Sequence, residues 1–225
     1  MKHPFDNIVW NALAGPHANH ATGTSDARRY APGFSPICGF ADPARPNVDA
    51  LAPFCEPGEA FYCDGWSGAP PTGWRIDAET IMLKMIFDAP MPANDDAPEA
   101  IRLGPEHVAQ VLELVALTHP GPFGPRTIEL GEYFGCFENG RLVAMAGERM
   151  RAGSLREISG VCTHPDFQRR GLARRLMNKL IRRETERGET PCLHVMRDNR
   201  KAARLYERMG FRLHRESLVR VISKG

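Results

Sequence analysis

The stretch QRRGLA, residues 168–173, is the most informative part of this chain. It lies between an extended, β-branched run at residues 158–163 and the long helical pattern that follows it. A strand that leads through a glycine turn into a helix presents free backbone N–H groups and the positive end of the helix dipole, which together bind phosphate. Gly171 lets an anion approach because it has no Cβ, and Arg169 and Arg170 add charge suited to a pyrophosphate. The stretch therefore predicts a phosphate-binding turn.

A second helix is predicted by DNRKAARLYERMGF, residues 198–211. Asp198 or Asn199 can cap its N-terminus, and Gly210 lies where a helix commonly ends. Helical spacing places an amide, two small side chains, a phenol and a thioether on one face, which is an unusual mixture for a stripe that only fills a core. These residues are Asn199, Ala202, Ala203, Tyr206 and Met209.

Residues from about 99 to the C-terminus resemble the GNAT superfamily of acyl-CoA-dependent N-acyltransferases, and they look closest to its FR47-like branch. The resemblance rests on three features in the right order: the strand EISGVCTHP, the turn QRRGLA, and the pattern N-x-x-A-x-x-L-Y-x-x-x-G-F of residues 199–211. It implies an α/β fold, with a GNAT-type mixed sheet and flanking helices at residues 99–225, preceded by a smaller α+β region at residues 1–95. It also implies acetyl-CoA, a coenzyme A thioester, as co-substrate.

The resemblance also assigns parts of the cofactor to parts of the chain. The turn holds the pyrophosphate, the strand backbone pairs with the pantetheine amides as an added strand would, and Asn199 reaches the same arm from the facing helix. For Asn199 a simple helix cap is the alternative, and the two roles are compatible. A backbone N–H near Val161, where the strand of the family bulges, would stabilise the oxyanion. The implied cofactor-binding residues are Val161, Cys162, Thr163, Gln168, Arg169, Arg170, Gly171, Leu172, Ala173, Asn199, Ala202 and Tyr206.

Two side chains are candidates for catalysis. Tyr206 is the candidate general acid, because a phenol with a pKa of about 10 is suited to protonating a departing thiolate. The alternative is a structural tyrosine whose ring packs under the sheet. Glu157 is the candidate base, because the resemblance puts it at the strand position of the catalytic glutamate of histone-type members. Glu148 and water are competing bases, and a third alternative is that Glu157 pairs with Arg149 or Arg156.

The composition limits the class of protein. Of 225 residues, 42% are hydrophobic and 25% charged, as in soluble globular proteins that bury a core. The net charge of +2 is too small to indicate nucleic-acid binding. Residues 168–187 hold eight Lys or Arg against two Glu, which fits a solvated helix face with phosphate contacts near the turn. A nucleic-acid-binding helix is a rival, but the paired short helices of a helix-turn-helix are missing.

Further patterns bear on compartment and partners. The six cysteines have no metal-like spacing, so we expect free thiols and no metal site. The N-terminus lacks the apolar core of a signal peptide, and no apolar run reaches the ~18 residues that cross a bilayer. We therefore expect a cytoplasmic protein, a monomer or homodimer, with no nucleic-acid or membrane partner.

The chain changes character at DAPMPANDDAP, residues 88–98, where proline and acidic residues predict a linker or exposed connection. The region before it is rich in proline, glycine and aromatic residues, with a short helix predicted at residues 7–13 and a strand at residues 79–87. It carries no chemical motif, and it is either a degenerate relative of the second half or a cover packed against it. Beyond the linker the patterns predict strands at 101–103, 133–138, 141–150, 155–163, 192–196 and 218–222, and helices at 105–118, 172–187 and from 199.

The acceptor side is less defined by the sequence. The loop at residues 119–127, together with Trp66 and Trp74, is a candidate lining for the acceptor pocket. We expect His164 to shape the turn after the central strand and His194 to be a satisfied core histidine, and the role of His119 stays open.

The main prediction is an enzyme that moves an acetyl group from acetyl-CoA to an amine of a small molecule, amino acid or peptide, by direct attack in a ternary complex. A non-catalytic sensor that binds acyl-CoA is the alternative.

Overall fold

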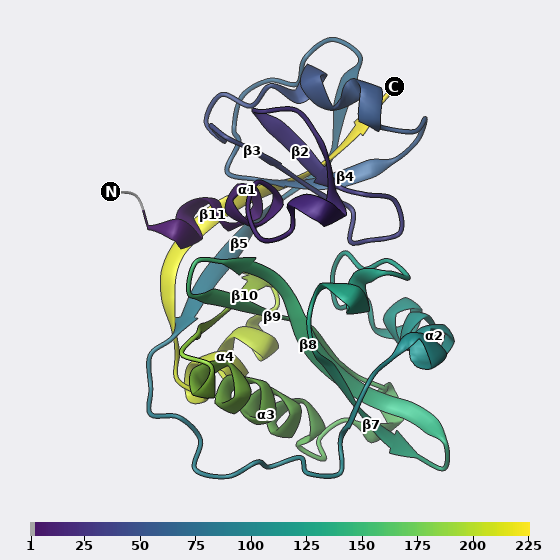
Figure 1. Cartoon of the computed structure of the whole chain (residues 1–225), viewed down its shortest axis with the longest axis vertical. Coiled ribbons are helices and arrows are strands. Elements are labelled where there is room, and N and C mark those ends of the chain that lie inside the picture. Colours follow the sequence, from purple (N-terminus) through teal and green to yellow (C-terminus); the bar gives the residue numbers. More distant parts are fainter. Residues whose placement is uncertain (1–2) are drawn as a thin grey trace.

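The computed structural model describes residues 3–225, which form one mixed sheet of 11 strands with helices on its faces (Figure 1). The strand order is β1-β2-β3-β4-β11-β5-β10-β9-β8-β7-β6. The helices are α1 Ile8–Leu13, α2 Val108–Thr118, α3 Leu172–Glu186 and α4 Arg200–Arg208, with short 3-10 helices at Pro4–Asn7, Ala18–His20, Val48–Phe54, Pro105–His107, Thr127–Leu130 and Pro165–Phe167. The strands are β1 Ala21–Gly23, β2 Ala27–Tyr30, β3 Ile37–Phe40, β4 Ala60–Asp64, β5 Trp74–Phe87, β6 Ile101–Arg102, β7 Tyr133–Glu138, β8 Arg141–Ala152, β9 Leu155–Thr163, β10 Thr190–Met196 and β11 Phe211–Lys224.

Helices cover both faces of the sheet in the lower half of the molecule (Figure 1). Successive side chains of a strand point to opposite faces. Phe134 accordingly packs in the core beneath α3 and α4, while its neighbour Tyr133 packs with Val111 and Leu114 of α2 on the other face. This arrangement is the predicted α/β fold with a mixed sheet and flanking helices.

Strands β5 and β11 tie the two halves of the chain together. Each has 14 residues, and they pair antiparallel from Phe211↔Phe87 to Lys224↔Trp74. Both run from the lower into the upper part of the molecule (Figure 1). β5 comes from the N-terminal region, yet it lies between β10 and β11 of the C-terminal region. The domain boundary between residues 95 and 99 stays a prediction, but one sheet passes through both regions.

The predicted strands at 79–87 and 218–222 were too short. Their extensions are rich in charged residues, which hide the hydrophobic alternation that marks a strand. In the structure charges of these extensions are paired, as Glu216 of β11 is with Arg197 at 3.3 Å. The predicted linker is a connection that follows α3 (Figure 1), where Asp95 pairs with Lys179 at 2.5 Å.

The parallel pair β9 and β10 opens the site. The two strands pair from Thr190↔Leu155 to Leu193↔Ile158, and pairing stops there although both strands continue. Within β9 the register against β8 shifts between Ser159 and Cys162, and Gly160 between them has a φ of 64°. Diverging strands and a bulge in the β9 backbone therefore occur at the same point, as the resemblance implied.

Among residues 3–225, no helix is long and apolar enough to cross a membrane. All six cysteines are free thiols.

Candidate active site

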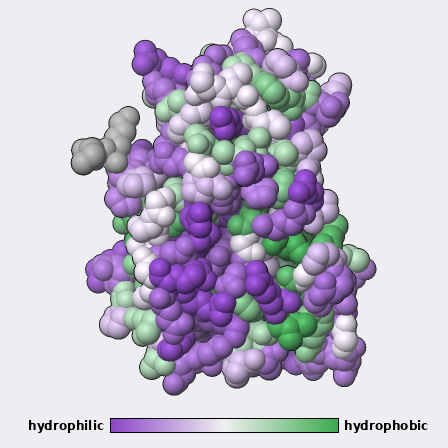
Figure 2. Space-filling model, viewed as in Figure 1, coloured by the Kyte–Doolittle hydropathy of each residue, from purple (hydrophilic) through white to green (hydrophobic). Residues whose placement is uncertain are grey.

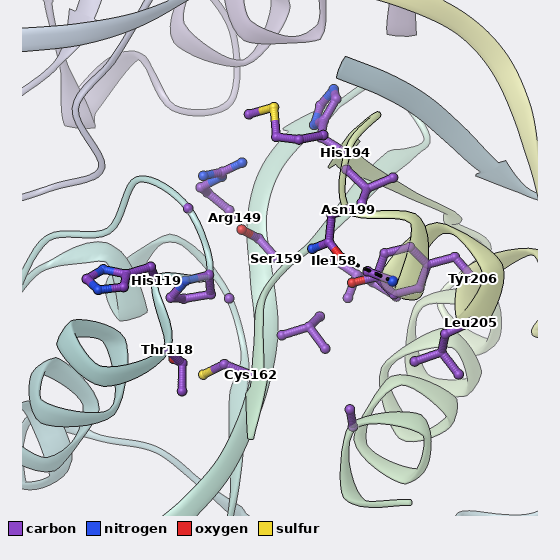
Figure 3. A pocket seen from close by; sticks show the side chains of 18 of the residues that line it. Thr118, His119, Arg149, Ile158, Ser159, Cys162, His194, Asn199, Leu205 and Tyr206 are labelled. Carbon is purple, nitrogen blue, oxygen red and sulfur yellow. Dashed lines mark hydrogen bonds between the residues drawn. The ribbon is translucent and has the colours of Figure 1, made fainter. Parts of the chain in front are cut away.

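A cavity of about 780 Å³ lies where β9 and β10 part. The predicted site residues come together in it: Glu157 lines the cavity, and so does every predicted cofactor-binding residue except Arg170. Figure 3 shows Tyr206 reaching from α4 toward β9, with Arg149 and His119 on the opposite side of that strand.

The turn before α3 has the geometry of an anion site. Gly171 precedes the helix with a φ of 76°, and a Cβ built there would meet no protein atom within 4 Å. The first intrahelical hydrogen bond runs from Arg175 N–H to the Gly171 carbonyl at 3.0 Å. The amides of Leu172 and Ala173 therefore precede the helical ladder and stay available to a ligand.

The cations around the turn fall into two groups. Arg170 is turned away from the cavity, because its guanidinium pairs with Glu138 at 3.1 Å and lies over the Phe167 ring. Other basic residues of α3 are also paired, for example Arg175 with Glu99 at 2.7 Å. Hydrophilic side chains cover α3 and α4 in Figure 2, as expected for a solvated helix face.

Four exposed cations line the cavity and have no acidic partner among residues 3–225. Of these four, only Arg169 was predicted from the sequence. The others lie one turn into α3 and along α4, where basic residues usually mark a solvated face, so the sequence carried no distinguishing signal. They are Arg169, Arg174, Lys201 and Arg208.

Tyr206 and Asn199 face the cavity from α4 (Figure 3). Burial, with a contribution from Cys162, raises the pKa of Tyr206 to about 12, so the phenol keeps its proton at neutral pH. The Asn199 side-chain oxygen accepts a hydrogen bond from the Ala202 N–H at 3.2 Å, and the residue also lines the cavity. The cap and a cavity-facing position thus occur together, as expected.

Glu157 is buried and fully engaged. Its two oxygens accept hydrogen bonds from Arg149 Nε and Nη2 at 2.9 and 2.7 Å, and His194 Nδ1 lies 2.7 Å from Oε1. Burial would raise the pKa of Glu157, but Arg149 and His194 outweigh it and lower that pKa to about 2. Of the alternatives for this residue, the ion pair with Arg149 is present. The competing base Glu148 pairs with Arg187 at 2.5 Å and does not line the cavity.

His194 departs from expectation. The prediction of a satisfied core histidine is wrong, because Nε2 has no hydrogen-bond partner among residues 3–225 and the ring lines the cavity. Glu157 engages only Nδ1. No local pattern indicated this, because the His194–Glu157 contact joins two strands whose register is set only in the folded sheet. His164, by contrast, shapes the turn as predicted, with Nδ1 accepting from the Asp166 N–H at 3.3 Å.

The acceptor side was predicted in part. The beginning of the predicted loop lines the cavity, from His119 to Pro122. The proposal for Trp66 and Trp74 is wrong, because both are buried in a separate N-terminal core and neither reaches the cavity. Other residues of the N-terminal region line it instead, namely Val9, Ile37, Tyr62, Asp64 and Met82.

Comparisons with known proteins agree with this site. A family model described as FR47-like protein matches residues 133–221. Among solved structures, a GNAT-family protein from Novosphingobium aromaticivorans DSM 12444 is 38% identical, covers 100% of this chain and 100% of its own, and has a TM-score of 0.90. Two further structures show the fold alone. A GCN5-related N-acetyltransferase-like protein from Streptococcus suis 89/1591 is 16% identical over 97% of this chain and 92% of its own, with a TM-score of 0.60. A GCN5-related N-acetyltransferase from Kribbella flavida is 16% identical over 95% of this chain and 93% of its own, with a TM-score of 0.57.

No curated protein matches this sequence. The full-length similarity to the Novosphingobium protein and the FR47-like match nevertheless agree with the parted strands and the turn before α3. The chain belongs to the GNAT family of acetyltransferases, with an FR47-like C-terminal portion.

Proposed function

We propose that this acetyltransferase moves the acetyl group of acetyl-CoA to an amine by direct attack in a ternary complex. One observation carries the proposal: a single cavity joins the anion-binding turn, the parted strands, Tyr206 and the His194 side chain, whose buried Nε2 has no hydrogen-bond partner among residues 3–225. Acetyltransferases of this family use acetyl-CoA, and the residues present fit it. Free helix amides, the open side of Gly171 and four unpaired cations suit a pyrophosphate and further phosphate.

Acetyl-CoA supplies the thioester whose acetyl group is transferred. The turn at residues 168–173 would hold its phosphates, and the unpaired β9 backbone from Val161 to Thr163 would bind its amide-bearing arm. At the Gly160 bulge the β9 backbone leaves the regular pairing with β8. A backbone N–H released there would donate a hydrogen bond to the oxyanion that develops during transfer.

Proton removal falls to His194, with Glu157 as its positioning residue. A carboxylate with a pKa of about 2 that is already bonded to Arg149 is a poor acceptor for an ammonium proton. In this proposal the same carboxylate fixes Nδ1 of His194 as a donor, so that the buried Nε2, which has no hydrogen-bond partner among residues 3–225, is the nitrogen that accepts the proton. The Glu157 base of the resemblance thus acts through the imidazole, in the manner of a carboxylate that orients a histidine.

Protons balance as follows in this proposal. His194 takes one proton from the ammonium, and the amine nitrogen attacks the carbonyl carbon. The C–S bond then breaks while the Tyr206 hydroxyl donates to the leaving sulfur. The second nitrogen proton, lost as the amide forms, restores the phenol.

The test combines binding with turnover. We expect calorimetry to give micromolar CoA affinity, and we expect thiol release from acetyl-CoA in the presence of primary amines. CoA binding without thiol release from any amine would favour the acyl-CoA sensor. Loss of both would contradict the family's cofactor at this site.

A further inference from the structure

We propose that the acceptor is a primary amine on an uncharged, mainly apolar body, and that the N-terminal region builds the chamber which selects it. This inference rests on the proposed function. Beyond His194 the cavity continues between the two regions of the chain. Six apolar side chains line this acceptor chamber, together with Tyr62 and Asp64: Val9, Ile37, Met82, Met150, Met196 and Val219.

The strand register puts the chamber on one face of the sheet. Directly opposed residues of antiparallel strands share a face. Met196 opposes Met82, His194 opposes Lys84, and Val219 opposes Asp64. Because β10 pairs with β5, β5 with β11, and β11 with β4, these side chains form one continuous surface.

This face is opposite to α3 and α4. Ile158 of β9 packs in the core with α3, so its neighbour Glu157 points to the chamber side. An amine in the chamber would therefore approach the parted strands from the face away from the helices that border the coenzyme arm.

Every charge at the chamber is already paired within the protein. Arg149 pairs with Glu157, and Lys84, which is fully buried, lies 2.5 Å from an Asp64 oxygen. The Ser217 hydroxyl donates to the other Asp64 oxygen. Lys84 Nζ also donates to the Phe5 and Asp6 carbonyls at 3.1 and 3.2 Å, so its hydrogen bonds are satisfied.

The two ends of the cavity thus differ in electrostatics. At the phosphate end four cations lack acidic partners among residues 3–225, which suits a polyanion. At the acceptor end an amino-acid carboxylate or a second ammonium would lose its water without gaining a counter-ion, which is costly. The amine to be acetylated avoids this cost because it gives its proton to His194.

The apolar wall favours the body of such an amine. Three of the six apolar residues are methionines, whose flexible thioethers adapt to ligands of different shape. The chamber therefore selects by the absence of charge and by apolar contact, and it accommodates aliphatic and aromatic amines.

The test uses amines that differ only in one charge. Phenethylamine and phenylalanine share a body but differ by a carboxylate, and hexylamine and cadaverine differ by a second ammonium. We expect kcat/KM at least tenfold higher for the first of each pair in thiol-release assays. Equal or better use of phenylalanine or cadaverine would overturn the inference.

Calorimetry on the CoA-saturated protein measures the same preference without turnover, and we expect it to bind phenethylamine more tightly than phenylalanine. If no amine releases thiol yet phenethylamine binds preferentially, the transfer reaction fails and the chamber's selectivity stands. If neither amine binds and neither turns over, the chamber assignment fails as well.

A variant can shift the preference. Lys84→Gln keeps a donor toward the backbone carbonyls but leaves Asp64 without its cation, so we expect the cadaverine-to-hexylamine ratio of kcat/KM to rise at least fivefold. Arg220→Gln is the matched control, since it breaks the pair between Arg220 of β11 and Glu79 of β5, neither of which lines the cavity, and should leave the ratio unchanged. An unchanged ratio in folded Lys84→Gln protein would show that Asp64 does not face the acceptor.

Discussion

Among the single side chains of the site, Tyr206 has the clearest expected effect on the rate. Tyr206→Phe removes one oxygen from a buried ring that also packs against Phe211. We expect kcat to fall by about 10²–10⁴-fold, because the leaving sulfur loses its proton donor. CoA affinity from calorimetry should change little. An unchanged kcat would remove the acid role.

His194 offers a test based on the basicity of the acceptor. In His194→Ala, alkylamines stay protonated and should react at least a hundredfold more slowly. The rate with a weakly basic arylamine, which is already unprotonated at neutral pH, should fall much less. Added imidazole should restore part of the rate with alkylamines. A merely structural histidine would slow both classes of amine equally and show no rescue.

Glu184 is a buried acid on α3 without a partner. Neither carboxylate oxygen has a hydrogen-bond partner among residues 3–225, and burial, together with Glu148, raises its pKa well above the usual value of 4.5. The folded state therefore binds a proton that the unfolded state releases above pH 4.5, and native stability falls as the pH rises through this window.

Replacing this acid should stabilise the protein at neutral pH. We expect Glu184→Met to raise the free energy of unfolding by about 1–3 kcal/mol at pH 8 and by much less at pH 4. Denaturant titration at both pH values measures this. Glu186→Gln on the same helix, which only breaks an exposed pair with Arg182, should change stability by less than about 0.5 kcal/mol. Equal effects at pH 4 and pH 8 would contradict a raised pKa.

Residues of the site differed in how far they could be predicted. Gly171, Asn199 and Tyr206 belong to local patterns, where spacing along one turn or one helix sets their positions. The partners of His194 and Lys84 lie on other strands, and only the register of the sheet brings them together. Local sequence therefore identified the cavity residues of the turn and of α4 better than those on the strands next to the N-terminal region.

The two ends of helix α3 can be compared by mutation, because a glycine of positive φ lies at each end. Gly171 and Gly188 have φ values of 76° and 73°, and neither would clash within 4 Å if given a Cβ. Substituting valine at either site should therefore lower the free energy of unfolding by a similar amount, about 1–3 kcal/mol. Only Gly171→Val should raise the Kd for CoA, by tenfold or more, because its side chain enters the cavity.

Calorimetry with CoA and thermal melts of both variants separate strain from binding. Retained affinity in Gly171→Val would mean that the phosphates bind elsewhere.

Elements of the C-terminal region were predicted more fully than those of the N-terminal region. The Asn139-Gly140 turn signal marked β7 and β8, and an extended β-branched run marked β9. Asn139 and Gly140 formed the expected turn, with both φ values positive. Strands β1 to β4 have at most five residues each, so no pattern of sufficient length exists to identify them. Lys84 is fully buried in β5. A lysine in a sequence usually indicates an exposed position, and its burial here could be expected only once its acidic partner was known.

The continuous sheet makes a prediction for the whole molecule. All three tryptophans lie in the first 74 residues, so fluorescence reports on the N-terminal region while far-UV circular dichroism reports on the entire chain. Because β5 and β11 span both regions, we expect the two signals to give one coincident unfolding transition. CoA, whose proposed site lies in the C-terminal region, should raise both midpoints equally. Separate transitions would mean that the regions unfold independently.

The position of β5 also governs when the protein can fold during synthesis. This strand leaves the ribosome early, whereas its neighbours β10 and β11 are among the last segments to be translated. Its two edges therefore remain unpaired until the C-terminus emerges, which makes the nascent chain a target for chaperones or for association with other chains. Assembly of the central sheet is in this sense a post-translational event, and a prematurely terminated product cannot complete it.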